Sequence, residues 1–264
     1  MIALTGRGAL ASELTKQKGV EVISIRELGE KIFWRRMKTV NTLIHNAASI
    51  NCENINECLS KNFDFSRKIV DFLVSNNSTV NFTYISSMSI LDPKSDKVFL
   101  DTSKMTPYAF SKYKAERYCV NSNITNLKVV RFSTLFYRDP LKDGLSKLIY
   151  DAITEHQITI YNGGIARRDF IPLSVAAAYV KKIAKFQSHE KEVFNVVSGI
   201  QTSYKNIVLY LKKNTHGLKI INIIKGNTPI VLSHFSTDSI KRLGKIKFSL
   251  EEEMEKYIRE IESS

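Results

Sequence analysis

The sequence predicts an α/β fold, a doubly wound parallel sheet followed by a small C-terminal lobe. Apolar runs of strand length alternate with amphipathic segments of helical period through the first half of the chain. The elements after Tyr137 are shorter and less regular. Strands and helices in this alternation form parallel neighbours with right-handed crossovers. We therefore expect a sheet domain over residues 1–137 and a lobe mainly over 138–264, with about 168–200 packing back on the sheet domain.

The elements of the first half follow from their hydrophobic periods. A strand alternates sides at every residue, whereas a helix returns to the same face after three or four residues. These periods predict strands over residues 1–5, 20–25, 42–48, 79–87 and 127–136, and helices over 9–19, 26–41, 57–76 and 107–122. Gly19 ends the first of these helices, as glycine commonly does.

The elements of the second half are assigned by the same periods. They predict helices over 143–155 and 174–186, a helix from Ser203 and a terminal helix from Ser249. They also predict short strands over 158–162, 192–199 and 219–224, with a loop over 163–172. No repeat or linker separates these pieces, so they are expected to form a lobe at the carboxyl ends of the strands, where doubly wound folds bind ligands.

The composition is that of a soluble globular protein. Apolar residues make up 43% and charged residues 25% of the 264 residues. No apolar run approaches the roughly 18 residues of a membrane span, and the N-terminal stretch lacks the pattern of a signal peptide. We therefore expect a cytoplasmic protein without a membrane partner.

The formal net charge of +13 raises the question of a polyanionic partner. The basic residues are scattered, with no run longer than pairs such as Lys181-Lys182. This pattern favours a solvated lysine-rich surface first, an anionic small substrate second and nucleic acid last.

The cysteines and histidines show no metal-ligand pattern. The three cysteines, Cys52, Cys58 and Cys119, lack paired spacing, and their odd number argues against a disulfide framework. The five histidines are isolated, at positions 45, 156, 189, 216 and 234. We expect reduced structural cysteines and no metal.

A glycine-rich turn, GRGALA, lies between the first strand and the first helix. It has the form G-x-G-x-x-A that accompanies dinucleotide binding on Rossmann-like sheets. Gly6 would make the tight turn, Gly8 would let the backbone approach a pyrophosphate, and Ala11 would allow close packing of the helix. The cofactor would then lie on the turn and the helix N-terminus, over Gly6, Arg7, Gly8, Ala9, Leu10 and Ala11.

The residue after the second strand distinguishes two cofactors. A carboxylate there accepts hydrogen bonds from the ribose of NAD, whereas an arginine binds the additional phosphate of NADP. Arg26 follows the strand, and Arg7 in the glycine turn could reach the same phosphate. Glu27 competes if the register differs by one residue. The sequence favours NADP, with NAD as the alternative.

The stretch TPYAFSKYKAE places Tyr108 and Lys112 four residues apart on a helix, and therefore on one face. Such a pair is commonly an ordinary solvated face. A free tyrosine has a pKa of about 10, and a nearby ammonium would lower it toward neutrality. The pair would then serve in acid-base chemistry.

The glycine turn together with HNAA, YISS and YAFSK resembles the extended short-chain dehydrogenase/reductase family, which includes NAD-dependent epimerases and dehydratases of nucleotide sugars. The resemblance covers nearly the whole chain and implies that Asn46, Ala47 and Ala48 line the cofactor. It further implies a catalytic set of Ser87, Tyr108, Lys112 and Asn62, in which Lys112 also holds the nicotinamide ribose.

The same resemblance implies a substrate site. RFSTLFY and RRDFIP resemble family segments that contact the substrate, so that Arg168 would bind the nucleotide diphosphate. Ser87, Met88 and Thr134 would contact the sugar, with Thr134 where the family commonly has asparagine. Each match alone also fits a structural role, for example Ser87 as a strand end or Arg168 as the partner of Asp169.

The sequence departs from the family at two places. The segment 26–41 is too short for the usual third strand with its flanking helices, so the sheet is expected to lack one edge strand. Met88 and Ser89 follow Ser87, where dehydratases of the family carry an Asp-Glu pair, and Met88 cannot ionise as the cysteine of some epimerising reductases does. Elimination is therefore disfavoured.

These observations imply an enzyme that reduces a keto group on a nucleotide-linked deoxysugar with NAD(P), as in polysaccharide precursor synthesis. The alternative is a nucleotide-sugar 4-epimerase with tightly bound NAD. A third hypothesis is a non-catalytic dinucleotide- or RNA-binding scaffold. The family also implies a homodimer through the helices of Asn62 and Tyr108, whose outer faces would offer aromatic and aliphatic side chains, namely Phe65, Ile69, Phe72, Phe110, Tyr113 and Tyr118.

Overall fold

The computed structural model describes the chain apart from residues 1, 17, 51, 96, 187–189 and 227–234, and apart from the side chain of Arg26. The chain forms two compact units. The first comprises residues 1–92, 97–132 and 176–196, and the second comprises residues 93–96, 133–175 and 197–264.

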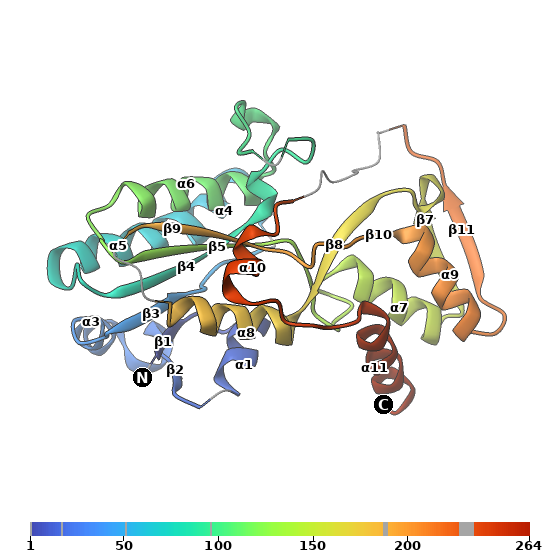
Figure 1. Cartoon of the computed structure of the whole chain (residues 1–264), viewed down its shortest axis with the longest axis horizontal. Helices are drawn as coiled ribbons and strands as arrows, with labels where there is room; N and C mark the ends of the chain where they lie inside the picture. Colours follow the sequence, from blue (N-terminus) through green and yellow to red (C-terminus); the bar gives the residue numbers. More distant parts are fainter. Residues whose placement is uncertain (1, 17, 51, 96, 187–189, 227–234) are drawn as a thin grey trace. The chain divides into compact units, whose positions relative to one another are not determined.

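The first unit is built on a six-stranded parallel sheet with the order β2-β1-β3-β4-β5-β9 (Figure 1). Its strands are β1 (Ile2–Thr5), β2 (Val20–Val22), β3 (Thr42–His45), β4 (Asn81–Ser87), β5 (Leu127–Phe132) and β9 (Glu192–Val196). From β1 the chain proceeds to β2 on one side and later to β3 on the other. The predicted doubly wound sheet is confirmed, with its topological switch between β1 and β3.

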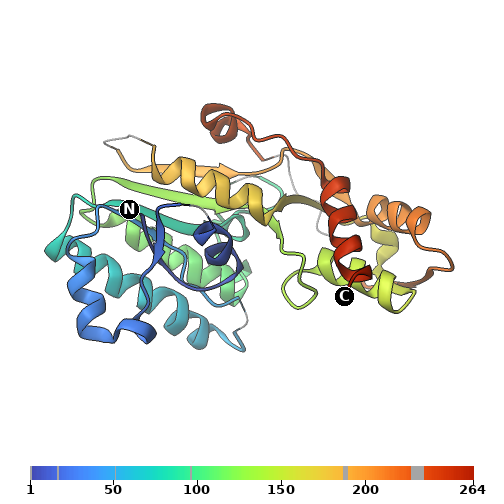
Figure 2. The ribbon, with the colours of Figure 1, turned by 90° about the horizontal axis from the view of Figure 1, so that it is seen from below.

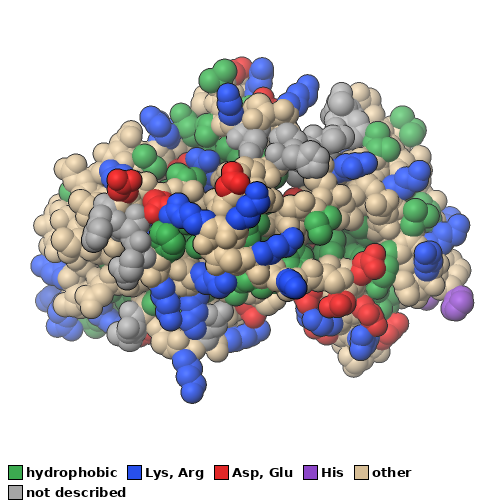
Figure 3. Space-filling view, in the orientation of Figure 1, with side chains coloured by type: hydrophobic (Ala, Val, Ile, Leu, Met, Phe, Trp, Pro, Cys, Tyr) green, Lys and Arg blue, Asp and Glu red, His purple; other side chains and the backbone are tan. Residues whose placement is uncertain are grey.

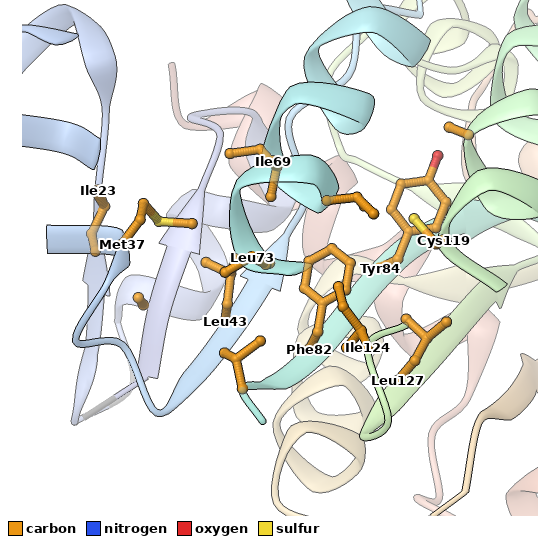
Figure 4. Close-up of a cluster of buried hydrophobic side chains, with 14 of the residues drawn as sticks. Ile23, Met37, Leu43, Ile69, Leu73, Phe82, Tyr84, Cys119, Ile124 and Leu127 are labelled. Atoms are coloured by element: carbon orange, nitrogen blue, oxygen red, sulfur yellow. The ribbon is translucent and has the colours of Figure 1, made fainter. Parts of the chain in front are cut away.

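Helices cover both faces of this sheet. Figures 1 and 2 show α3 (Glu30–Met37), α5 (Phe65–Asn76) and α6 (Pro107–Asn121) on one face and α1 (Ala9–Thr15) and α8 (Leu173–Ala184) on the other. Between the first face and the strands lies a dry core, part of which Figure 4 shows. Met37, Leu73 and Phe82 are among its fully buried members. Burial on this scale provides the main favourable free energy of folding.

Residues 26–41 form α2 (Ile25–Leu28) and α3, with no strand between them. Gly29 separates the two helices and has a φ of 73°, a conformation that favours glycine. The strand β2 stops at Val22, earlier than predicted, and pairs with β1 alone in the described part of the sheet. The expected loss of an edge strand is confirmed.

The second unit contains two small sheets. One has the order β10-β8-β6 and consists of β10 (Gln201–Ser203), β8 (Arg167–Pro172) and β6 (Thr134–Phe136); the other pairs β7 (Gln157–Tyr161) with β11 (Lys219–Ile223). Its helices are α7 (Gly144–Thr154), α9 (Tyr204–Asn214), α10 (Asp238–Leu243) and α11 (Leu250–Glu262). The apolar faces of α7, α9 and α11 share a core that includes Phe136, Phe170 and Tyr257.

Two predicted elements differ. Residues 127–136 form two strands rather than one, because β5 ends at Phe132 in the first unit and β6 begins at Thr134 in the second. The predicted loop 163–172 contains β8, which pairs with β6 and β10 on its two sides. A strand with two partners satisfies its backbone groups through long-range pairing, which a local sequence pattern does not reveal.

Cys52 and Cys58 form a disulfide, so the prediction of reduced cysteines is wrong for this pair. The helix α4 (Ile55–Cys58) begins at Asn54, whose side chain accepts a hydrogen bond from Glu57 N at 3.0 Å. This cap turns the chain, and the two Cα atoms of the cysteines lie 5.3 Å apart. Cys119 is free and buried, as predicted.

Lysine and arginine side chains are spread over the face seen in Figure 3 and lie among aspartates and glutamates. Many belong to short-range ion pairs on helices, such as Lys147 with Asp151 at 2.9 Å. In the described ranges no helix has the length and apolar character that a bilayer span requires.

Candidate active site

The glycine turn lies at the switch between β1 and β3. Gly6 has a φ of 100°, and a Cβ at this position would lie 2.9 Å from the backbone nitrogen of Ala47. Any side chain would therefore separate the two strand ends, which are joined by a hydrogen bond from Asn46 N to Thr5 O at 3.1 Å. The local fold requires glycine here.

Gly8 differs from Gly6 both in its backbone angle φ and in the space around it. It is the N-cap of α1 with a φ of −68°, which any residue adopts, and a Cβ there would meet nothing within 4 Å. Neither backbone strain nor protein packing explains the glycine, and the open space beside it would allow a pyrophosphate to approach the backbone. Leu10 and Ala11 are buried and pack α1 on the sheet. The glycine turn therefore fits a dinucleotide.

The residues after β2 provide charges of both signs. Arg7 and Glu27 form an ion pair in which both side chains are about half exposed, 49% and 54%. Glu27 lies in α2, directly after Arg26. Arg7 thus extends toward the segment that follows β2, where its partner is the carboxylate of Glu27.

The structure brings Ser87 and Tyr108 together. Ser87 ends β4 and caps a short helical turn, and its Oγ accepts a hydrogen bond from Ser89 N at 3.1 Å. Ser89 Oγ lies 2.9 Å from Ser87 Oγ, and Ser87 lies close enough to the Tyr108 phenol to act on its pKa. Three hydroxyls therefore form one array, of which Ser89 is exposed.

Tyr108 is held at the start of α6. Thr106 caps this helix by accepting a hydrogen bond from Ala109 N at 3.2 Å, and Pro107 occupies the first helical position. Burial raises the pKa of the Tyr108 phenol to about 12, although the hydrogen bond with Ser87 acts against this rise. Tyr108 is therefore protonated at neutral pH.

Lys112 is buried one turn further along α6, with 3% of its surface exposed. Its Nζ donates to the carbonyl of Ile85 at 2.6 Å and lies 4.8 Å from the centre of the Tyr84 ring. Burial lowers the pKa of Lys112 to about 8, while Cys119 and Glu116 act in the opposite direction. The lysine is thus charged at pH 7 and loses its proton within reach of physiological pH.

The prediction that Lys112 lowers the pKa of Tyr108 is wrong. The pKa of the Tyr108 phenol is raised, not lowered, because desolvation of the phenol outweighs the other influences. The lysine makes its hydrogen bond with Ile85 on β4. The i,i+4 spacing correctly placed both residues on α6, but spacing does not show where a flexible side chain ends.

Asn62 lies in a π-helical turn, Leu59–Asp64, between α4 and α5. Its side chain is buried, accepts from Ser49 N at 2.7 Å and donates to Ser49 O and Ser111 Oγ, each at 3.0 Å. Single π turns often occur at functional sites. The structure thus joins Asn62 to α6, the helix of Tyr108 and Lys112.

Thr134 and Arg168 belong to the second unit, on β6 and β8. Arg168 is half-buried and donates to the carbonyl of Arg167 at 3.2 Å. Its neighbour Asp169 is buried and accepts from four donors, Ser133 Oγ, Ser198 N, Ser198 Oγ and Gly199 N, at 2.7 to 2.9 Å. That Thr134 and Arg168 contact substrate beside Ser87 and Met88 stays a prediction.

Sequence reasoning missed several residues of the site. Ser89 and Ser111 each contact a predicted residue directly. Glu116, one turn after Lys112, is buried and accepts hydrogen bonds from Ser86 at 2.6 Å and from Arg131 Nε at 3.1 Å. The i,i+4 spacing of Lys112 and Glu116 could have indicated this third position on the same helical face.

No group of three His, Cys, Asp or Glu side chains is placed to hold a metal ion among the residues that the structure describes. Two of the histidines considered above, at positions 189 and 234, lie outside those residues.

The family follows from a sequence comparison. The sequence model of the NAD dependent epimerase/dehydratase family matches residues 34–197, more than half of the chain. The chain belongs to this family, and it is an enzyme of the extended short-chain dehydrogenase/reductase type, so that the scaffold hypothesis is wrong. A search of curated proteins finds no match.

Solved structures show the same fold. TunA, a NAD-dependent NDP-hexosamine 5,6-dehydratase of tunicamycin biosynthesis, has a TM-score of 0.80 at 17% identity over 100% of this chain and 98% of its own. UDP-glucuronic acid 4-epimerase from Bacillus cereus has a TM-score of 0.79 at 16% identity over 100% and 99%. ADP-L-glycero-D-manno-heptose-6-epimerase from Helicobacter pylori has a TM-score of 0.78 at 18% identity over 100% and 96%.

The two glycines of the turn should separate stability from binding. Gly6→Ala places a Cβ against the Ala47 backbone at a positive φ, and we expect it to lower the free energy of unfolding by about 1–3 kcal/mol. Gly8→Ala meets no atom, and its stability should stay within about 1 kcal/mol of wild type. Urea unfolding measures both changes.

The same variants should differ in cofactor binding. Gly8→Ala is expected to weaken dinucleotide binding at least about tenfold, equivalent to 1.4 kcal/mol, because its methyl group occupies the space that a pyrophosphate would enter. Calorimetric titration measures the affinity. Wild-type affinity in Gly8→Ala would show that no phosphate approaches this residue.

The buried ammonium of Lys112 should reduce stability at neutral pH. Its pKa is about 8 in the folded chain and 10.5 in the unfolded chain. Between these values the unfolded chain binds more protons, so the penalty is fully present below pH 8 and decreases as pH rises. Relative to Lys112→Met, the unfolding free energy of wild type should increase by about 2 kcal/mol from pH 7 to pH 9.5.

Urea unfolding of both proteins at the two pH values gives this difference. The comparison removes the contributions of all groups that titrate alike in the two proteins. Parallel pH dependence of wild type and Lys112→Met would contradict the lowered pKa of Lys112.

Proposed function

We propose that this enzyme reduces a keto group on a nucleotide-linked deoxysugar with NAD(P). The observation that carries the proposal is the placement of the Tyr108 phenol beside Ser87, whose Oγ lies 2.9 Å from Ser89 Oγ. Reduction of a ketone requires a proton donor for the oxygen that becomes a hydroxyl. A phenol that keeps its proton at neutral pH is in the correct state for this direction.

Each residue of the array has a distinct task in this proposal. Ser87 donates a hydrogen bond to the keto oxygen and thereby fixes its position. Tyr108 then gives its proton to this oxygen. Ser89, hydrogen-bonded to Ser87 and exposed, provides a path by which the proton on Tyr108 is replaced from solvent. The dinucleotide, when bound, supplies the hydride.

The remaining predicted residues position the reactants. Gly6, Gly8 and the Asn46-Ala47-Ala48 segment would hold the dinucleotide at the strand switch, and Lys112 would hold its ribose. Arg168 would bind the nucleotide diphosphate, and Thr134 would contact the sugar. Correct placement of reacting atoms supplies a large share of catalysis in such a reaction.

Elimination of water from the sugar is not proposed. That reaction needs acid-base groups beside the catalytic hydroxyl, and here Met88 is buried and apolar while Ser89 carries only a hydroxyl. Neither side chain can act as a base with a pKa near neutrality.

A nucleotide-sugar 4-epimerase is the second candidate. Glu27 carries a carboxylate in the segment that follows β2, where such a group can accept hydrogen bonds from the ribose of NAD. The Bacillus cereus epimerase was solved with UDP-glucuronic acid and NAD. An epimerase returns the hydride to the sugar, so it would show no net consumption of the dinucleotide.

We keep NADP as the proposed cofactor for the reductase, because Arg7 and Arg26 together could bind its additional phosphate, and NAD as the alternative. We also propose a cytoplasmic location and no nucleic-acid partner.

A homodimer through α5 and α6 is also proposed, with a smaller contact surface than the sequence suggested. Ile69 is fully buried against the sheet and cannot contribute, because it lies on the inner face of α5. Phe110 and Tyr113 are half-buried and fit the proposal, whereas Phe65, Phe72 and Tyr118 pack partly against the core. Light scattering at micromolar concentration tests it.

The reaction can be tested with a panel of nucleotide-linked 4-keto-6-deoxysugars and their hydroxy forms. Absorbance at the reduced-nicotinamide band measures cofactor consumption, and NMR identifies the products. Stoichiometric consumption supports the reductase, whereas isomerised sugar without consumption supports the epimerase. If no member gives either signal, the proposed substrate class is wrong.

Tyr108→Phe should abolish turnover and leave dinucleotide affinity nearly intact. The change deletes the proton donor and keeps the ring in its packing. Loss of a general acid typically costs 10²- to 10⁴-fold in rate. Turnover within a few fold of wild type would remove Tyr108 from this role.

The pair Arg7→Ala, Arg26→Asp should invert or abolish a preference for NADPH over NADH. The pair removes two cations and adds a carboxylate where the phosphate would lie. Charge-assisted hydrogen bonds contribute roughly 1.5–3 kcal/mol, so NADPH affinity should fall at least about tenfold. NADH lacks the phosphate and should bind as before or more tightly. An unchanged affinity ratio would favour the NAD-dependent epimerase.

A further inference from the structure

A continuous chain of buried hydrogen bonds begins directly before the glycine turn. Thr5 Oγ1 lies 2.6 Å from His45 Nδ1, and His45 Nε2 lies 2.9 Å from Ser66 Oγ. Ser66 Oγ donates to the carbonyl of Asn62 at 2.6 Å. All four side chains have about 1% of their surface exposed. The chain therefore joins β1, β3 and the π turn inside the first unit.

The donors fix the tautomer of His45. Because Ser66 gives its hydroxyl proton to Asn62 O, it can only accept from His45, so Nε2 carries the imidazole proton. Nδ1 then accepts the proton of the Thr5 hydroxyl. Burial lowers the pKa of His45 to about 3, and Lys112 acts in the same direction. The imidazole is held neutral as one specific donor and acceptor.

The chain continues from Asn62 to the reacting tyrosine. Asn62 Nδ2 donates to Ser111 Oγ at 3.0 Å, and Ser111 Oγ donates to the carbonyl of Tyr108 at 2.8 Å. Ser111 is fully buried. A single path of polar contacts therefore links the residue before Gly6 to the backbone of Tyr108.

We propose that His45 is a positioning residue: through Ser66 it fixes Asn62, and through Asn62 and Ser111 it fixes Tyr108 relative to the glycine turn. The proposal deepens the proposed function and rests on it where Tyr108 is concerned. The Asn62 carbonyl lies in a π turn, where the backbone pattern of an α-helix is interrupted, and Ser66 Oγ is its hydrogen-bond donor. His45 in turn keeps Ser66 in the orientation that makes this bond.

A purely structural core histidine is the competing explanation. The rings of Phe65, Phe82 and Tyr84 lie 5.6, 6.3 and 5.9 Å from the His45 ring, which is a typical packed environment. A structural role predicts a loss of stability when one of these hydrogen bonds is removed. A positioning role predicts, in addition, that the loss of turnover passes through Asn62.

A double-mutant cycle in the full-length enzyme separates the two roles. Ser66→Ala removes the hydroxyl that joins His45 to Asn62 by hydrogen bonds. It should lower kcat about tenfold and keep KM within about twofold of wild type, because only the approach of Tyr108 to the substrate is disturbed. In an Asn62→Ala background the same change should lower kcat less than twofold. An equal loss of kcat in both backgrounds, or no loss in either, would overturn the proposal.

Two further variants control the cycle. Ser66→Thr keeps the hydroxyl and should keep kcat within about threefold of wild type. Thr83→Val removes a buried hydroxyl on β4 that has no hydrogen-bond partner in the described structure, and it should leave kcat and KM unchanged. A tenfold loss of kcat in Ser66→Thr would show that the shape of the side chain, not its hydrogen bond, matters at this position.

A spectroscopic readout is independent of the substrate. In ¹⁵N-labelled protein the His45 imidazole should show a proton on Nε2 and remain neutral at pH 5. Ser66→Ala should shift the backbone amide signals of Ser111 and Tyr108, whereas Thr83→Val should not. Unmoved signals in Ser66→Ala would overturn the proposal even if no sugar is turned over, while shifted signals without turnover of any sugar would leave the positioning intact and reject the proposed reaction.

Discussion

The close pairing of β1 with β3 is the constraint on which the first unit depends. The two strands run parallel with Thr5 opposite His45, and the chain after each of them crosses at Gly6 and Ala47 with no room for a Cβ. This approach places a hydroxyl and an imidazole side by side at the carboxyl ends of the strands, where open α/β sheets bind their ligands. The glycine turn and the buried polar chain thus begin from one contact.

Burial determines the charge states of the reacting groups. Desolvation raises the pKa of Tyr108 and lowers the pKa of Lys112 and His45, so that in each case the neutral form gains. The helix spacing of Tyr108 and Lys112 is compatible with a phenol whose pKa is lowered by the lysine. In the structure, burial raises the pKa of this phenol, so that it stays protonated. A protonated phenol is in the state that proton donation requires.

The sequence predicted the order of most elements, because hydrophobic periods locate strands and helices. The family resemblance proposed Ser87, Tyr108 and Asn62 as site residues, and the structure joins Asn62 through Ser111 to the helix of Tyr108. The sequence could not predict the strand β8, the Cys52–Cys58 disulfide or the direction of the Lys112 side chain. Each of these depends on a partner that is distant in sequence or on a turn whose geometry a residue pattern does not specify.

Both units hold a proposed site residue near a buried polar group whose hydrogen bonds are satisfied. In the second unit Asp169 is buried, and each of its two carboxylate oxygens accepts hydrogen bonds from two donors. It thereby joins β8 to the start of β6 and to the turn before β10, and it fixes the backbone that carries Arg168. In the first unit His45 has the same relation to Asn62. A buried polar group whose hydrogen bonds are satisfied fixes the backbone around it, and it thereby fixes the place from which a nearby side chain extends.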